Sequence, residues 1–335
     1  MISFERLDLD AVPWGEIDAF ADRTIYQTRP WLEFVAETQD AEPVVAEVLD
    51  GGDRVGYFTG LVVRKLGLRI LGSPFKGWTT AYQGFNLPPG TNRRDFLCAL
   101  PDLAFRELGC HYVEVCDRHA ESADGAARGY AVEHFRGYEI DLTQTEEELF
   151  ARMKGACRRC IRKAAKVGVR IEEADDEGFA DDYYEQLLDV FAKQSLVPTY
   201  DLARIRALVR NVHHSGNLLL LRARNEENEC IATGIFPAYN DTMYFFGGAS
   251  WRKHQILRPN EALMWHAMKY WKARGIARYD MGGSGDYKRK YGGYDISVPR
   301  FMLPRYPMLM TLRNLAERAW KIRQSLAGRG RGASG

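Results

Sequence analysis

The alternation of hydrophobic and polar positions predicts the same series of elements in two parts of the chain. In the first part, residues 55–71 have the pattern of a β-hairpin, residues 94–108 that of an amphipathic helix, and residues 111–117 that of a strand. A loop rich in glycine and proline, residues 72–90, connects the hairpin to the helix. The predicted order is therefore hairpin, loop, helix and strand.

The second part of the chain, residues 229–281, repeats this order. Asn240 lies at the turn of its hairpin, and Pro259 and Gly275 lie at the start and just past the end of its helix. Proline lacks an amide that the first helical turn cannot use, and glycine accepts the left-handed conformation at a helix exit. The repeat predicts an α/β (α+β) fold built from two similar units, with mixed sheets and flanking helices.

A helix is also predicted between the two parts. Thr145 and Glu148 have the spacing of a capping box, and an apolar stripe continues from there until Gly168 ends the helix. We therefore place a domain boundary near residue 143. The predicted domains are residues 1–143, residues 144–305, and a basic helix with a flexible tail at residues 306–335.

Composition restricts the class of protein. The chain has 335 residues, of which 46% are hydrophobic and 27% charged, as in a soluble globular protein. Its start lacks the pattern of a signal peptide, and no apolar stretch reaches the roughly 18 residues of a membrane span. We expect a cytoplasmic protein, with peripheral contact at the inner face of the membrane as a further expectation.

The six cysteines give no sign of a metal site. Cys157 and Cys160 form a C-x-x-C pair, but neither a second pair nor suitably spaced histidines complete a zinc site. They lie three residues apart in a helical pattern, which favours core packing over metal or redox chemistry. We expect no bound metal and no bound cofactor.

Charge is segregated just after the predicted boundary. Eight residues between Arg152 and Arg170 are Lys or Arg and none is acidic, whereas residues 172–189 hold nine Asp or Glu and no base. A solvated helix usually interleaves the two signs. Either these cations bind an anionic ligand, or the acidic segment beside them neutralises them. The candidate anion-binding residues are Arg158, Arg159, Arg162, Lys163 and Lys166.

The loop GGSGDYKRKYGGYD, residues 282–295, follows the last strand of the second part. Its glycines allow the backbone to approach a ligand closely, and Lys288 lies in a cluster of three cations between them. The loop has neither the spacing of a nucleotide-hydrolysing P-loop nor that of a dinucleotide fingerprint. Loops at the carboxyl ends of strands are where binding sites collect, so this loop is the main candidate site.

Signatures of covalent catalysis are lacking. No G-x-S-x-G motif supports a serine nucleophile, and the seven histidines include no H-x-x-x-H pair. Two acidic residues are candidates for a proton acceptor. Glu261 lies in the first turn of its helix, where its alternative role is to complement the helix dipole. Asp280 lies at a strand end, where its alternative role is to orient a neighbouring loop.

Two segments resemble one known family. CRRCIRKAAKVGV (residues 157–169) resembles the R-x-x-I-R-K-A-x-K-x-G-V segment of the FemABX peptidyltransferases and their N-acyltransferase relatives with a GNAT-like fold. Residues 247–293 are similar to a second run of that family, in which P-N, a helix with a tryptophan, Y-D-x-G-G and F-K-x-x-F-G-G follow one another. Tyr287 and Tyr291 stand where the family has phenylalanine. The likeness covers residues 146–301 well.

This resemblance implies tandem GNAT-like domains and an N-acyltransferase. The donor would be acyl-CoA or aminoacyl-tRNA, bound by the second domain, and the acceptor would be an amine of a cell-envelope or polysaccharide precursor, on the side of the first domain. The proposed catalytic residues are Lys288, Glu261 and Asp280. The proposed donor-binding residues are Tyr287, Arg289, Lys290, Tyr291, Asn260 and Trp265, and the acceptor-binding residues are Lys76 and Trp78.

The helix start of the second part departs from ordinary acetyl-CoA enzymes. Those enzymes place [RQ]-x-x-G-x-[GA] at a helix start, so that backbone amides bind the pyrophosphate. Here the loop before Pro259 contains no glycine. A competing class is a non-catalytic module whose cations bind RNA or an anionic membrane surface, in the latter case through residues 311–335.

Overall fold

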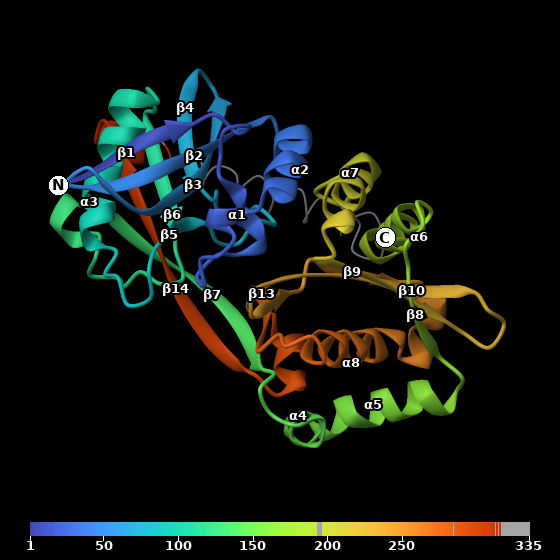
Figure 1. Ribbon diagram of the computed structural model, residues 1–335. Helices are drawn as coiled ribbons and strands as arrows, with labels where there is room; N and C mark the ends of the chain where they lie inside the picture. The colour runs from blue at the N-terminus through green and yellow to red at the C-terminus, as the bar shows by residue number, and fades with distance from the viewer. Residues whose placement is uncertain (193–195, 284, 312, 314, 316–335) are drawn as a thin grey trace.

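The two parts of the chain fold into two halves that lie side by side (Figure 1). The computed structural model describes residues 1–192, 196–283, 285–311, 313 and 315. In the first half, the helices are α1 (Trp14–Ile17), α2 (Arg29–Gln39) and α3 (Arg94–Asp102), and the strands are β1 (Ile2–Leu7), β2 (Ala41–Asp50), β3 (Asp53–Lys65), β4 (Leu68–Ser73), β5 (Gly84–Asn86), β6 (Tyr112–Cys116) and β7 (Ala131–Asp141).

The second half has its own set of elements. Its helices are α4 (Glu146–Arg152), α5 (Gly155–Lys166), α6 (Phe179–Ala192), α7 (Leu202–Val212) and α8 (Pro259–Lys272), with 3₁₀ turns η5 (Arg252–Leu257) and η6 (Asp286–Tyr291). Its strands are β8 (Arg170–Glu173), β9 (Leu218–Arg224), β10 (Cys230–Tyr239), β11 (Thr242–Tyr244), β12 (Gly247–Ser250), β13 (Arg278–Gly283) and β14 (Tyr294–Pro304).

The two halves repeat one topology. In the first, β1, β2, β3 and β4 pair in antiparallel order, and β4 pairs with β6 in parallel after the α3 crossover. In the second, β8, β9, β10 and β11 pair in antiparallel order, and β11 pairs with β13 in parallel after the α8 crossover. The duplicated α/β architecture predicted from the sequence is confirmed.

The halves exchange their last strands. β7 of the first half pairs with β13 of the second, and β14 of the second half lies between β6 and β7. The strands therefore form one hydrogen-bonded series, β1-β2-β3-β4-β6-β14-β7-β13-β11-β10-β9-β8. Because each half completes the sheet of the other, the chain crosses between the halves after residue 143 and again before Tyr294. The predicted domain boundaries stay a prediction.

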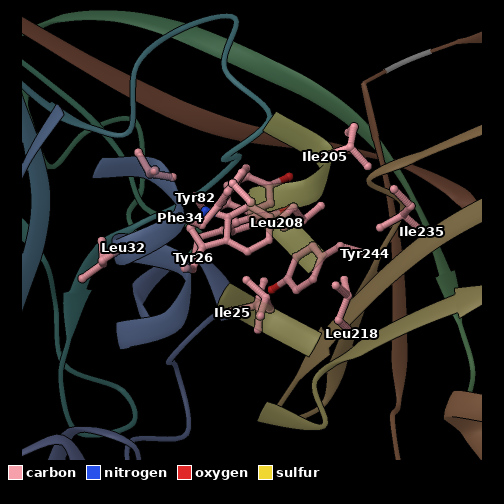
Figure 2. Close-up of a cluster of buried hydrophobic side chains, with 14 of the residues drawn as sticks. Ile25, Tyr26, Leu32, Phe34, Tyr82, Ile205, Leu208, Leu218, Ile235 and Tyr244 are labelled. Carbon is pink, nitrogen blue, oxygen red and sulfur yellow. The ribbon is translucent and has the colours of Figure 1, made fainter. Parts of the chain in front are cut away.

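A shared apolar core also joins the halves. Tyr26 and Phe34 of the first half face Leu208 and Tyr244 of the second in one cluster of buried side chains (Figure 2). The rings of Tyr26 and Tyr244 lie 4.8 Å apart between centroids. Helices α2 and α7 pack against each other over this cluster. The interface between the halves is thus built like a domain interior.

Helices cover both faces of the second-half sheet. α8 packs on one face of β9 and β10, and α5 packs on the outer side of α8 (Figure 1). α6 contacts the other side of the sheet through β10 and β12. No helix among the described residues is long and apolar enough to span a membrane. The predicted helix and tail at 306–335 lie, from residue 316 on, outside the described residues.

The single helix predicted after Thr145 is wrong in one respect, because the structure has two. The capping box is confirmed: the Glu148 amide donates to Thr145 Oγ1 at 3.2 Å, and the Thr145 amide donates to Glu148 Oε2 at 2.8 Å. Met153 and Lys154 are then extended and separate α4 from α5. The Lys154 amide donates to the carbonyl of Lys290 at 2.9 Å. This hydrogen bond joins distant parts of the chain, and no local sequence pattern predicts it.

The strand exchange generates a test of coupling between the halves. Phe301 of β14 is fully buried in the core of the first half. Phe301→Ala should therefore lower the free energy of unfolding by about 3–5 kcal/mol, as for other buried phenylalanines. Amide hydrogen exchange in the variant should accelerate in β6 as well as in β14. Ser297→Ala, at an exposed position of the same strand, is the control. Unchanged exchange in β6 would contradict the coupling.

Candidate functional site

A cleft of about 620 Å³ lies between the two halves. Its walls come from the carboxyl end of β13 and the start of η6 on one side, and from β7 and the loop after β4 on the other. Five residues predicted from the sequence line it: Lys76, Trp78, Asp280, Tyr287 and Lys288. The structure thus brings the predicted acceptor loop to the predicted donor loop.

Lys288 is held at the cleft by the backbone of β13. It is buried, and its Nζ donates to the carbonyls of Met281 at 2.5 Å and Gly283 at 2.7 Å. An ammonium group has three N–H donors, so one is left for a ligand in the cleft. Burial lowers the pKa of Lys288, and the charge of Asp280 opposes that shift. Gly282, at φ +69°, has the left-handed conformation that this turn requires.

Asp280 is the buried carboxylate of the cleft wall. Burial raises its pKa, and the Arg118 guanidinium and the Gly282 amide oppose that shift. Arg118 Nη1 donates to Asp280 Oδ2 at 3.2 Å, and the Gly282 amide donates to Asp280 Oδ1 at 2.7 Å. The pKa is raised because burial outweighs the pairing. Asp280 therefore has the features of a proton acceptor that is more basic than an exposed aspartate.

Arg118 links the two halves at this point, and the sequence analysis missed it. Besides Asp280 of β13, its guanidinium pairs with Glu139 of β7, which also accepts a hydrogen bond from the Tyr294 hydroxyl of β14 at 2.6 Å. Arg118 follows β6 by two residues, as the glycine-rich loop follows β13. One signal in the sequence pointed to Arg118, its position just after a predicted strand, and no motif includes this residue.

Five predicted donor-binding residues and one predicted base lie outside the cleft lining. Glu261 is buried in the first turn of α8 and pairs with Lys290 at 2.7 Å. Arg289 forms two hydrogen bonds of 2.7 Å with the carboxylate of Asp295. Three other residues of this group lie elsewhere: Tyr291 is in the core, Asn260 donates to the Ser250 hydroxyl, and the ring of Trp265 packs at a tilt against that of Phe150. Tyr287 alone of the predicted donor-binding set lines the cleft.

The five predicted anion-binding residues lie on α5 and form no ion pair with any described residue. The acidic segment that follows has other partners: Asp176 and Asp182 pair with Arg222, and Glu172 pairs with Arg224. The interpretation in which these acids neutralise α5 is therefore wrong for the described part of the chain. Among the five, Arg162 lies over the ring of Phe150 at 5.2 Å. The anion-binding role itself stays a prediction.

Two further cations line the first-half side of the cleft, and the sequence analysis named neither. Arg136, on β7, is exposed and has no ion pair among the described residues. Arg300, on β14, is buried, donates to the carbonyl of Pro74 at 2.7 Å, and lies 4.0 Å from Glu114. Lys76 on the same side pairs with Glu133 at 2.7 Å. The cleft thus offers positive charge from both halves.

Comparison with known proteins shows which family and which solved structures this chain is similar to. Residues 151–291 match the model of a family described as an acetyltransferase (GNAT) domain. The matched residues lie in the second half, which is therefore similar to a GNAT acetyltransferase domain. The chain as a whole has the tandem GNAT-like fold that the resemblance of its motifs implied, and it shares this fold with FemX. No curated protein sequence matches the chain.

Solved structures share the fold at low sequence identity. FemX superposes with a TM-score of 0.70 at 14% identity, over 88% of this chain and 96% of that one. A tandem GNAT protein from the clavulanic acid biosynthesis pathway has a TM-score of 0.54 at 13% identity, over 92% and 99% of the two chains. L-PGS from Bacillus licheniformis has a TM-score of 0.53 at 12% identity, over 85% and 94%.

The absence of described partners for the α5 cations generates a stability prediction. Replacing Arg159, Arg162 and Lys163 together with glutamine should change the free energy of unfolding by no more than about 0.5 kcal/mol for each substitution, as for other surface positions. Arg222→Gln is the comparison, because it leaves Asp176 and Asp182 without their buried partner and should cost about 1–3 kcal/mol. Urea unfolding measures both. A triple variant as unstable as Arg222→Gln would contradict the prediction.

Proposed function

We propose that the chain transfers an acyl or aminoacyl group from an activated donor to an amine, in the cleft between the halves and without a covalent enzyme intermediate. The observation that carries this proposal is the presence of Asp280 and Lys288 in one cleft of a GNAT-type fold. A buried carboxylate and a backbone-held ammonium group suit amine acylation, which needs a proton acceptor and a stabilised oxyanion but no nucleophile from the protein.

Each residue has a defined part in the proposed reaction. The amine nitrogen of the acceptor attacks the acyl carbonyl carbon and gives a proton to the carboxylate of Asp280. The carbonyl oxygen becomes an oxyanion, to which the remaining N–H of Lys288 donates. When the tetrahedral intermediate collapses, the bond to the donor oxygen or sulfur breaks and that atom leaves with the electron pair. The proton on Asp280 then neutralises the leaving group or passes to water.

The residues on the donor side favour a mode of donor binding that differs from that of ordinary acetyl-CoA enzymes. The first turn of α8 begins with Pro259, which has no amide, and contains the Glu261 carboxylate paired with Lys290. A pyrophosphate placed there would meet fewer donors and a negative charge. The α5 cations, unpaired in the described chain, support a donor with several phosphates. Aminoacyl-tRNA and acyl-CoA both have this chemistry, and the two are separate arms of the experiment.

The acceptor would enter from the first half. Lys76 and Trp78 line that side of the cleft, and Arg136 adds a cation without a described ion pair. An amine carrying a phosphate or carboxylate fits these side chains, and precursors of the cell envelope or of polysaccharides have such groups. One similar structure is described as the C-terminal domain of a putative lysylphosphatidylglycerol synthetase, and that name supports aminoacyl transfer as the general reaction.

The experiment that tests the proposal is product detection by mass spectrometry. The purified chain is incubated with acyl-CoA mixtures in one arm and with charged tRNA in the other, each with amine-bearing envelope precursors. A new amide that requires the chain supports the proposal and identifies the donor. The second candidate function, a non-catalytic RNA-binding module, is favoured by the free α5 cations. Salt-sensitive RNA binding with no amide product in either arm would favour that module.

Lys288 generates the first kinetic prediction. If its free N–H donates to the oxyanion, Lys288→Met should lower kcat by about a hundredfold, comparable to the loss of one oxyanion donor, with a smaller change in KM. Lys290→Met is the matched control, because Lys290 belongs to the same loop but pairs with Glu261 outside the cleft lining. Equal losses in the two variants would remove Lys288 from the reaction.

Asp280 and Arg118 generate a prediction for the pH profile. The Arg118 charge lowers the pKa of Asp280, so Arg118→Gln should raise that pKa further. A base with a higher pKa stays protonated up to a higher pH, so the acidic limb of the kcat/KM profile should move to higher pH. Arg118→Lys keeps a positive charge and should shift the limb less. An acidic limb at the same pH in Arg118→Gln and in the unmodified chain would rule out Asp280 as the base.

A further inference from the structure

Several large apolar side chains are exposed around one contact between α6 and η5. Arg252, the first residue of η5, donates to the carboxylate of Asp189 from its amide at 2.8 Å and from Nε at 3.0 Å. Near this contact Val197 is 73% exposed and Ile256 66% exposed. Leu188 and Leu196 are exposed as well. Exposed leucine, isoleucine and valine side chains are individually common, but a group of them marks an interaction surface.

These side chains belong to three short segments: the last turns of α6, residues 196–197 and η5. Leu188 precedes Asp189 in the last turns of α6, and the Leu196 amide donates to the carbonyl of Phe191 in the same helix at 3.1 Å. Ile256 belongs to η5, which the Asp189–Arg252 pair joins to α6. We call Leu188, Leu196, Val197 and Ile256, with the cations described next, the η5 surface.

Two cations accompany the apolar side chains. Lys253 and Arg258 are exposed, and neither forms an ion pair with a described residue. A surface that combines protruding apolar side chains with unpaired cations matches the boundary of an anionic bilayer, where apolar groups enter the acyl region and cations remain at the phosphates.

The η5 surface and the candidate site lie at the same end of α8. η5 leads directly into α8, and Glu261 in the first turn of that helix pairs with Lys290 of η6, the turn that contains Lys288. We infer that the η5 surface docks the protein on anionic phospholipid bilayers and so holds the cleft next to the lipid surface. This inference does not require the proposed transferase reaction, because it concerns binding alone.

Vesicle sedimentation tests the inference. The full chain is spun with vesicles of phosphatidylcholine alone and of phosphatidylcholine mixed with phosphatidylglycerol, and the bound fraction gives a partition coefficient. We expect binding to the mixed vesicles that weakens with added salt. Lys253→Gln should lower the partition coefficient by about fivefold, the value of one cation near a charged bilayer. The double change Val197→Glu with Ile256→Glu should lower it by at least about tenfold.

Matched variants keep the test specific. Leu66→Glu changes a leucine that is 95% exposed in the β3–β4 turn of the first half and should leave binding unchanged. Melting temperatures of all variants should stay close to that of the unmodified chain, because every changed side chain is exposed. Equal affinity for neutral and mixed vesicles would overturn the inference. So would loss of binding on changing the α5 cations Arg159, Arg162 and Lys163 to glutamine while the η5 variants bind normally.

Discussion

The exchange of the last strands between the halves is the constraint on which the site depends. β7 lies next to β13, and so the first half supplies the wall that faces Asp280 and Lys288. β14 lies next to β6, and so the second half places Arg300 beside the loop after β4. Arg118 completes the junction by pairing with carboxylates on β13 and β7. A GNAT half without its partner would have an open sheet edge where this chain has a cleft.

Burial decides the charge state of the site more than pairing does. Asp280 has a guanidinium and an amide beside it, yet its pKa is raised, because a fully buried carboxylate loses more hydration than these contacts return. Lys288 has two carbonyl acceptors and the charge of Asp280, yet its pKa is lowered for the same reason. The shifts make the carboxylate of Asp280 a stronger base and the protonated form of Lys288 a stronger acid, and a more acidic ammonium group is a stronger hydrogen-bond donor.

What the sequence predicted was local, and what it missed was set by contacts between distant segments. The Thr145 capping box, the Asn240 turn and the helix between Pro259 and Gly275 follow from residues a few positions apart, and the structure has all three. The exchange of β7 and β14 joins strands more than 150 residues apart, and alternation of side chains does not identify a strand's partner. The break between α4 and α5 has the same origin, since it depends on a bond to Lys290.

Within the site the same division holds. Lys288 and Asp280 belong to a motif whose spacing is readable in one segment, whereas Arg118 and Arg136 are single arginines on first-half segments. They belong to the candidate site only because the fold places them beside residues of the second half. The sequence likewise did not show whether the α5 cations pair with the acids that follow them. Three of those acids bind Arg222 and Arg224 instead, and these arginines are about 40 to 50 residues further along the chain.

The duplication places an equivalent carboxylate in each half. Glu114 and Asp280 occupy the same place in the two repeats, each five residues after the glycine that ends its crossover helix, and each lies on the strand parallel to the end of the hairpin. Glu114 accepts the Lys76 amide at 2.8 Å and so fixes the loop that lines the cleft. Asp280 instead pairs across the junction with Arg118 and lines the cleft itself. The two equivalent carboxylates thus differ in their surroundings, because Glu114 holds a wall of the cleft and Asp280 faces the cleft itself.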